Sequence, residues 1–295
     1  MENLSLQSVL LIQLWIFGLG LVVGSFLNVC IYRIPEGISI VWPASKCIYC
    51  SKRIVWYDNI PVLSYLFLRG KCRHCRSKIS VQYPIVEAIT GLVFLLLFHS
   101  VLMSSGDMIC AYIFYIIFCC LLIVGSFIDL RLHIIPNEIT YTGLVLALIA
   151  ALLCTGFHNL NSSLGYSDNS ANQWIASLLV SLKGILVSGG LIFLCGVFGK
   201  LVFKKDAMGF GDVKLMGVIG GFLGWKLAVA TFFLAPFFGL LFGMPRLILK
   251  RGNVIPYGPF LSLAAFICLL FKDYFVGIFD DYLDVYLHIF SYLLT

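Results

Sequence analysis

Charged residues are scarce in this 295-residue chain. Asp, Glu, Lys and Arg make up only 12% of it, whereas soluble domains contain about a quarter. With 61% hydrophobic residues and a mean hydropathy of +1.01, the composition excludes an ordinary soluble domain and places most of the chain in lipid. The first three residues also lack a basic residue, and the apolar run from about Val9 to Ile31 is too long for a signal peptide. We therefore expect a retained first span.

Apolar stretches of about twenty residues, enough to cross about 30 Å of hydrocarbon, recur along the chain. They predict an all-α polytopic membrane protein with about eight transmembrane helices, or seven if the short sixth stretch does not cross. The predicted spans are 8–32, 82–103, 108–128, 138–157, 174–199, 211–225, 227–245 and 257–276. Trp225-Lys226 is expected to make the turn between the sixth and seventh spans.

The basic residues predict the orientation of the chain. Nine of the twenty Lys and Arg residues lie in the loop 33–81, and eight more fall on the same side in this threading. The loop 158–173 has neither Lys nor Arg and is expected to be exported. The net charge of +6 follows from this cytoplasmic bias, and we predict no nucleic-acid partner, because no basic patch interleaved with stacking aromatics occurs outside the loop 33–81.

Four cysteines in the loop 33–81 form two C-x-x-C pairs, Cys47/Cys50 and Cys72/Cys75, separated by 21 residues. This spacing is typical of a structural four-thiolate zinc site, in which each pair supplies two ligands from one tight turn. Four unpaired cysteines, or two redox pairs, are the alternative. The other seven cysteines lie in apolar segments and are expected to be small buried hydrophobic residues.

Two carboxylates, Asp129 and Asp212, lie at the predicted cytoplasmic ends of spans. Asp129 follows twenty uncharged residues, or about 30 Å of helix, and Asp212 follows Gly209-Phe210-Gly211. These glycines leave room beside the carboxylate for a substrate backbone. Glycines spaced by four along 217–224 predict close packing, which we expect against the helix that ends in Asp129.

A pair of carboxylates that shares a proton can activate water against a peptide bond. The alternative is that Asp129 pairs with Arg131 while Asp212 caps a helix N-terminus. The residues alone leave both interpretations open. Asp58 and Glu87 are expected to pair with cations of the loop 33–81.

Five motifs occur in order along the chain. They are Gly24–Pro35, the cysteine loop with Trp56–Tyr65 and Tyr83–Glu87, Asp129 with Ile135-Pro136-Asn137, Met208–Leu215, and Ile255–Phe260. Together, over about residues 20–275, they resemble the bacterial type IV prepilin peptidases, a family of Gly-x-Gly-Asp intramembrane aspartyl proteases. The family commonly has Asp where this chain has Asn137, a position outside the catalytic pair.

The resemblance implies that Asp129 and Asp212 are the catalytic pair, with Gly209, Gly211 and Lys214 in the supporting loop. It implies cleavage of the leader from type IV prepilins or type II secretion pseudopilins at the cytoplasmic face of the bacterial inner membrane. It also implies that the new N-terminal amine is methylated with S-adenosylmethionine. The candidate residues for methylation are Gly24, Asn28, Arg33 and Glu36. Gly24 to Asn28 fit a notch of small residues between helices equally well.

The predicted organisation has four parts. They are a first transmembrane helix at 1–32, a cytoplasmic tetracysteine zinc domain at 33–81, a transmembrane aspartyl protease core at 82–276 and a C-terminal interfacial segment at 277–295. A peptidase without methyltransferase activity, or a non-enzymatic assembly subunit of a pilus or secretion machine, are the alternative functions. A transporter is disfavoured because the candidate acids lie near the membrane edge rather than at its middle.

Overall fold

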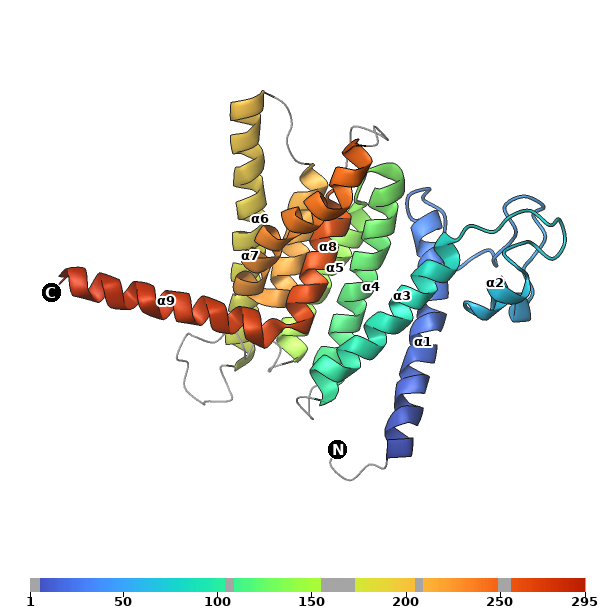
Figure 1. The fold of residues 1–295 in the computed structure, drawn as a ribbon, viewed down its shortest axis with the longest axis horizontal. Helices are drawn as coiled ribbons and strands as arrows, with labels where there is room; N and C mark the ends of the chain where they lie inside the picture. Colours follow the sequence, from blue (N-terminus) through green and yellow to red (C-terminus); the bar gives the residue numbers. More distant parts are fainter. Residues whose placement is uncertain (1–5, 104–108, 155–172, 205–208, 249–255, 295) are drawn as a thin grey trace. The chain divides into compact units, whose positions relative to one another are not determined.

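Helices account for all regular secondary structure in the part of the chain that the computed structural model describes, residues 6–103, 109–154, 173–204, 209–248 and 256–294 (Figure 1). The predicted all-α class is therefore confirmed. Most of the predicted exported loop 158–173, and the motif residues Met208 and Ile255, lie outside these ranges. The chain divides into two compact units, Met1–Leu132 and His133–Thr295.

The first unit contains three long helices that pack against one another, because α1 contacts α3 and α4, and α3 contacts α4. Its elements are α1 (Leu6–Arg33), the 3-10 helix η1 (Trp56–Asn59), α2 (Leu63–Phe67), α3 (Gln82–Leu97), the π-helical η2 (Phe98–Met103) and α4 (Ile109–Leu132). The loop between α1 and α3 projects to one side of these helices (Figure 1).

Helices α1 and α3 approach closely at glycines. A Cβ atom at Gly20 would lie 2.7 Å from the Cα atom of Gly91, and one at Gly24 would lie 2.7 Å from the Cα atom of Glu87. Real Cβ atoms do not tolerate such distances, so any larger residue would push the two helices apart. Gly24 therefore has a packing role, as the small-residue interpretation of this segment expected.

The second unit contains five helices. They are α5 (Asn137–Leu153), α6 (Gln173–Phe203), α7 (Phe210–Ile248), α8 (Gly258–Leu270) and α9 (Lys272–Leu294). Helix α7 is interrupted at Gly224, whose φ of 76° and ψ of 170° are a conformation that favours glycine. The interruption falls one residue before the turn that the sequence predicts at Trp225-Lys226.

The predicted number of about eight spans is not confirmed. Among the described residues, five helices are long and apolar enough to cross a membrane, and a sixth is added if α8 and α9 form one bent span. The predicted sixth and seventh spans lie together in α7, and α5, with 17 residues, is shorter than the spanning helices.

The glycines of α7 pack closely, as predicted, but against other partners than expected. The closest atoms to Gly220 belong to Gly184 and Ser188 of α6, and a Cβ atom at Gly221 would lie 2.9 Å from the Cβ atom of Ala147 in α5. The Ser188 hydroxyl donates a hydrogen bond of 2.8 Å to the carbonyl of Met216 across this contact. The glycine stripe thus joins α7 to α6 and α5, whereas the sequence suggested the helix that ends in Asp129.

Helix α9 turns away from α8 at an angle of 86° (Figure 1). The predicted eighth span therefore ends at Leu270, and the last helix begins at Lys272, five residues before the predicted interfacial segment. The fully buried Lys226 of α7 donates a hydrogen bond of 2.5 Å to Asp280 of α9. This ion pair joins α9 to the residues that follow the break in α7.

Not all of the seven cysteines outside the C-x-x-C pairs are the small buried thiols that were expected. Cys110, in the first turn of α4, and Cys154, at the end of α5, are disulfide-bonded. Cys30, Cys119 and Cys268 are buried, as predicted, whereas Cys195 is exposed and Cys120 is partly exposed, which the prediction did not anticipate. Nothing in the spacing of apolar residues distinguishes a disulfide partner from a buried thiol, so the sequence alone did not separate these two groups.

Candidate functional site

The four cysteines of the loop come together in the structure. The Sγ atoms of Cys47, Cys50, Cys72 and Cys75 all lie within 4.8 Å of one another, and those of Cys47 and Cys75 are 3.8 Å apart. In a tetrahedral zinc site with Zn–S bonds of about 2.3 Å, geometry places the sulfur atoms about 3.8 Å from one another. The four thiols therefore fit a zinc ion with no further coordination position.

The two C-x-x-C turns share one local structure. In the first, the Cys47 N–H donates to the carbonyl of Lys52 at 2.9 Å, and the Ser51 N–H donates to the carbonyl of Cys47 at 2.9 Å. The equivalent bonds in the second turn are Cys72 N–H to Ser77 at 2.9 Å and Arg76 N–H to Cys72 at 3.0 Å. Ser51 and Arg76, which follow the second cysteine of each turn, both adopt a positive φ, at 55° and 58°. Each pair is thus held by its own backbone.

The ionisation of these thiols is uneven. Burial opposes ionisation of Cys47, but hydrogen bonds from the backbone of Cys50 and Tyr49 outweigh it and lower its pKa to about 6. A backbone hydrogen bond from Lys52 favours the thiolate of Cys50, yet burial and the neighbouring thiols raise its pKa to about 11. Four negative sulfur atoms this close repel one another, so a bound cation is needed for all four to be ionised.

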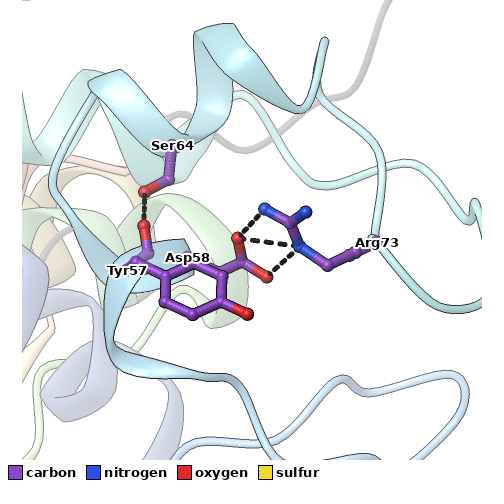
Figure 2. Close-up of polar contacts among 4 residues, drawn as sticks. All are labelled: Tyr57, Asp58, Ser64 and Arg73. Carbon is purple, nitrogen blue, oxygen red and sulfur yellow. Dashed lines mark hydrogen bonds and ion pairs between the residues drawn. The ribbon is translucent and has the colours of Figure 1, made fainter.

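An ion pair links the second C-x-x-C turn to the rest of the loop (Figure 2). Arg73 donates hydrogen bonds of 2.8 Å and 2.6 Å to the two carboxylate oxygens of Asp58, and its guanidinium lies 5.3 Å from the centre of the Tyr57 ring. The hydrogen bond from Arg73 lowers the pKa of Asp58 below its usual value. The expected pairing of Asp58 with a cation of the loop is confirmed.

Glu87 of α3 was expected to pair with a cation of the loop. In the structure it binds the backbone of the loop instead. Glu87 is 7% exposed, and its Oε2 atom accepts a hydrogen bond of 2.7 Å from the Val62 N–H. Ser25 of α1 is a second hydrogen-bond partner of this carboxylate. Val62 has φ 59° and ψ −50°, and the Leu63 N–H donates to the carbonyl of Pro61 at 2.5 Å, which makes a strained γ-turn. Glu87 therefore holds this turn against α1 and α3.

The four candidate residues for methylation lie in different surroundings. Gly24 contacts α3, and the buried Asn28 donates hydrogen bonds to the carbonyls of Tyr83 at 3.1 Å and Gly24 at 3.3 Å. Arg33 donates to the carbonyls of Ser39 at 2.9 Å and Pro43 at 2.7 Å, and Glu36 is exposed. Of the four, Arg33 also lines a cavity.

That cavity, of about 340 Å³, lies between one face of α1 and the loop. It is lined by Val22, Ser25, Phe26, Val29, Arg33, Ile40, Val41, Pro43, Ala44, Ser45, Asn59 and Pro61. Sequence patterns did not predict this cavity, because one of its two walls is the folded loop, most of whose lining residues lie outside regular secondary structure. We call it the Arg33 cavity.

Asp129 lies in the last turn of α4, in the first unit, and is 5% exposed. Such burial is unusual for a carboxylate and marks a functional candidate. Its neighbour Arg131 has its guanidinium 5.8 Å from the centre of the Tyr32 ring.

Asp212 lies in the first turn of α7, in the second unit, and is half-buried. A Cβ atom at Gly209 would lie 3.5 Å from its Oδ2 atom, so the glycine leaves one side of the carboxylate open. Lys214 donates a hydrogen bond of 2.6 Å to Oδ1 of Asn137 and lies 4.8 Å from the centre of the Tyr141 ring. Lys214 thereby fastens the first turn of α7 to the start of α5.

The comparisons with known proteins match both parts of the chain. The model of the bacterial Peptidase A24 N-terminal domain matches residues 18–101, and that of the type IV leader peptidase family matches residues 116–244. A prepilin leader peptidase/N-methyltransferase of Pseudomonas putida is 33% identical over 86% of this chain and 89% of its own length. A protein of that name from Aeromonas hydrophila is 30% identical over 88% and 90%. A type 4 prepilin-like proteins leader peptide-processing enzyme of Escherichia coli O78:H11 is 34% identical over 83% and 88%. No solved structure matches the chain.

Proposed function

Because the chain belongs to the type IV leader peptidase family, we propose that it is a membrane aspartyl endopeptidase that cleaves the leader from type IV prepilins or type II secretion pseudopilins. We propose further that it methylates the new N-terminal residue with S-adenosylmethionine. The observation that carries the first activity is that the leader peptidase match, residues 116–244, contains both Asp129 and Asp212. The names of the relatives, which join both activities, support the second.

Asp129 and Asp212 act as the general acid and general base in this proposal. One carboxylate takes a proton from water, whose oxygen attacks the carbonyl carbon of the scissile peptide bond, while the protonated carboxyl group donates to the carbonyl oxygen. The carbon–nitrogen bond then breaks, and a proton passes to the departing amine. No covalent intermediate forms, and the two carboxyl groups titrate as one coupled pair.

The residues around Asp212 have supporting roles in cleavage. Gly209 keeps space beside the carboxylate for an extended peptide, and a Cβ atom at Gly211 would lie 3.2 Å from the Cβ atom of Ile135, so a side chain there would displace the turn. Lys214, held by Asn137, keeps the helix start in place. A peptide cut just outside its apolar helix also needs little unwinding within lipid.

We propose that the protein lies in a bacterial inner membrane, with the cysteine loop and both aspartates on its cytoplasmic side. Basic residues in the last turns of α1 and α4, Arg33 and Arg131, support it through the positive-inside rule. The disulfide-bonded Cys110 lies at the opposite end of α4 from Asp129, which agrees with an oxidising compartment on that side. The four cysteines of the loop, by contrast, are free.

The last helix, α9, is proposed to lie along the membrane surface. Its 86° turn from α8 and its ion pair with Lys226 support this placement over a continued crossing. The lipid bilayer is thus a partner of both units.

Methylation is proposed to depend on the first unit. S-adenosylmethionine supplies a methyl group on a sulfonium, so that the carbon–sulfur bond breaks, a carbon–nitrogen bond forms and the amine loses one proton. The four cysteines would hold zinc in a closed site, which fixes the loop and leaves no position for catalysis. Gly24 and Asn28 set the contact of α1 with α3, Arg33 ties the end of α1 to the loop, and Glu36 lies exposed beyond it.

The test is cleavage of a purified pilin precursor by the detergent-solubilised protein, followed by mass spectrometry of the product. Asp129→Asn and Asp212→Asn should each lower the cleavage rate by about 10²- to 10⁴-fold or more, because an amide cannot exchange the proton. Asp281→Asn, an exposed acid of α9, is the matched control and should cleave as the wild type does. A mature product heavier by one methyl group would support the second activity.

Cleavage at the wild-type rate by either aspartate variant, in folded form, would refute the aspartyl protease assignment. A non-enzymatic assembly subunit would tolerate both substitutions, since Asn preserves the shape of Asp. A cleaved product without a methyl group would leave a peptidase alone.

A further inference from the structure

We propose that the Arg33 cavity binds the methyl donor, S-adenosylmethionine. This inference rests on the proposed methyltransferase activity and assigns it a site. The leader peptidase match covers residues 116–244 and contains both candidate catalytic aspartates. The cavity lies wholly between residues 22 and 61, inside the separate N-terminal match of residues 18–101. A second activity on a second substrate is therefore best placed in this unit.

The size and lining of the cavity suit a nucleoside. Its volume of about 340 Å³ falls within the range of about 300–1,000 Å³ typical of small-molecule sites. Val22, Phe26 and Val29 recur along one face of α1 and provide an apolar wall for a flat base. Ser45 and Asn59 bring hydroxyl and amide groups from the loop, which suit the hydroxyls of a ribose.

The charges around the cavity match the charges of this donor. A guanidinium has five N–H groups, and Arg33 uses one bond each to the carbonyls of Ser39 and Pro43, so N–H groups remain for a carboxylate. On another side, Ser25 both lines the cavity and hydrogen-bonds the buried carboxylate of Glu87. A ligand that carries a carboxylate together with ammonium and sulfonium cations is complementary to both groups.

The loop side of the cavity is held in place by specific contacts. Pro61 begins the strained γ-turn at Val62, which Glu87 holds through its hydrogen bond of 2.7 Å. Pro43 is held by Arg33 at 2.7 Å, and the carbonyl of Ser45 accepts a hydrogen bond of 3.0 Å from Ile54. Strain of this kind persists only where the surroundings demand it, and here it shapes the wall of a cavity. Glu87 is thus a positioning residue as well as a source of negative charge.

The experiment measures binding directly, by titration calorimetry of the zinc-loaded full-length protein in detergent micelles. The probes are S-adenosylmethionine and its neutral thioether product, S-adenosylhomocysteine. Ala44→Trp, which fills the cavity from the loop, should weaken binding of both probes at least tenfold. Leu66→Trp, an exposed position of α2 away from the cavity, is the matched control and should bind as the wild type does.

Glu87→Gln tests the charge separately from the shape. The amide oxygen of Gln can still accept the hydrogen bond from Val62, but the negative charge is gone. Affinity for the cationic S-adenosylmethionine should then fall several-fold more than affinity for the neutral thioether. A merely structural role of Glu87 would lower both affinities equally, and this result would overturn the electrostatic part of the proposal.

The two proposals fail in different ways. A wild-type protein that neither binds the probes nor methylates a cleaved pilin would refute the methyltransferase activity and the cavity together. A wild type that methylates, with an Ala44→Trp variant that binds both probes as tightly, would overturn the cavity assignment alone. Zinc content equal to that of the wild type shows that the loop is folded. If Ala44→Trp loses zinc, Val29→Phe fills the same cavity from α1 and gives the decisive result.

Discussion

Removal of Asp280 should destabilise α9 far more than removal of its partner, Lys226. The side chain of Lys226 has no exposed surface, whereas that of Asp280 is 41% exposed. Asp280→Leu leaves a buried cation without a counter-charge, which should lower the free energy of unfolding by about 3 kcal/mol, the lower end for broken buried pairs. Lys226→Met leaves a carboxylate that water can solvate, so this variant should lower the free energy of unfolding by about 1 kcal/mol or less.

The double variant Lys226→Met/Asp280→Leu places two apolar side chains at the contact. Because apolar replacement of a buried ion pair is often neutral, we expect the double variant to lie within about 1 kcal/mol of the wild type. It should then be more stable than Asp280→Leu alone. The coupling energy from this double-mutant cycle should be about 2–4 kcal/mol.

The assay uses Trp225, whose ring lies 6.2 Å from that of Phe279 in α9. Thermal unfolding is followed by its fluorescence in a background where the other four of the five tryptophans are phenylalanine. At about 2–4 °C per kcal/mol, Asp280→Leu should lower Tm by about 6–12 °C. Asp281→Leu, at an exposed neighbouring position, is the control and should change little. Equal losses from the two single substitutions, or losses that simply add in the double variant, would refute the reasoning.

Two further predictions concern polar contacts in the loop and at the start of α7. Asn137→Asp turns the 2.6 Å hydrogen bond with Lys214 into an ion pair and should raise Tm by about 1–3 °C in the same assay; a gain that persists in a Lys214→Met background would contradict this. Arg73→Gln removes the guanidinium that lowers the pKa of Asp58. A depressed carboxylate pKa stabilises the folded state only while the carboxylate is ionised. The contribution of this ion pair to stability is therefore present at neutral pH and is lost below about pH 4. The difference in Tm between wild type and Arg73→Gln should therefore hold at neutral pH and shrink as the pH falls below about 4, and an unchanged difference would show that Asp58 does not carry the effect.

Local patterns predicted much of the fold and the cluster of four cysteines. A span needs about twenty apolar residues, and lipid forces their backbone into helices, so the helices follow from hydropathy. The break in α7 was expected at Trp225-Lys226 and occurs at Gly224, because a Gly-rich stretch is where a helix is easily interrupted. The clustering of the four cysteines was also predicted from a local pattern, because each C-x-x-C pair is contained in one short turn.

Contacts between distant residues were less accessible to prediction. Lys226 and Asp280 are 54 positions apart and meet only because α9 turns by 86°, which no periodicity encodes. The prediction of which helix packs against the α7 glycines was wrong for the same reason. A stripe of small residues indicates close packing but does not indicate which helix packs there. Glu87 was expected to meet a cation and binds Val62 instead, because the γ-turn at Val62 depends on the folded loop.

The first C-x-x-C turn and the wall of the Arg33 cavity belong to one continuous segment of backbone. Ser45, in the cavity wall, lies two residues before Cys47, and its carbonyl is bonded to Ile54 on the far side of the turn. Release of a metal ion from the cysteines would free this wall, while the spanning helices would stay in place in the lipid. If the four cysteines hold zinc and the Arg33 cavity binds the methyl donor, as proposed, zinc starvation should leave leader cleavage intact and yield mature products with unmodified amino termini.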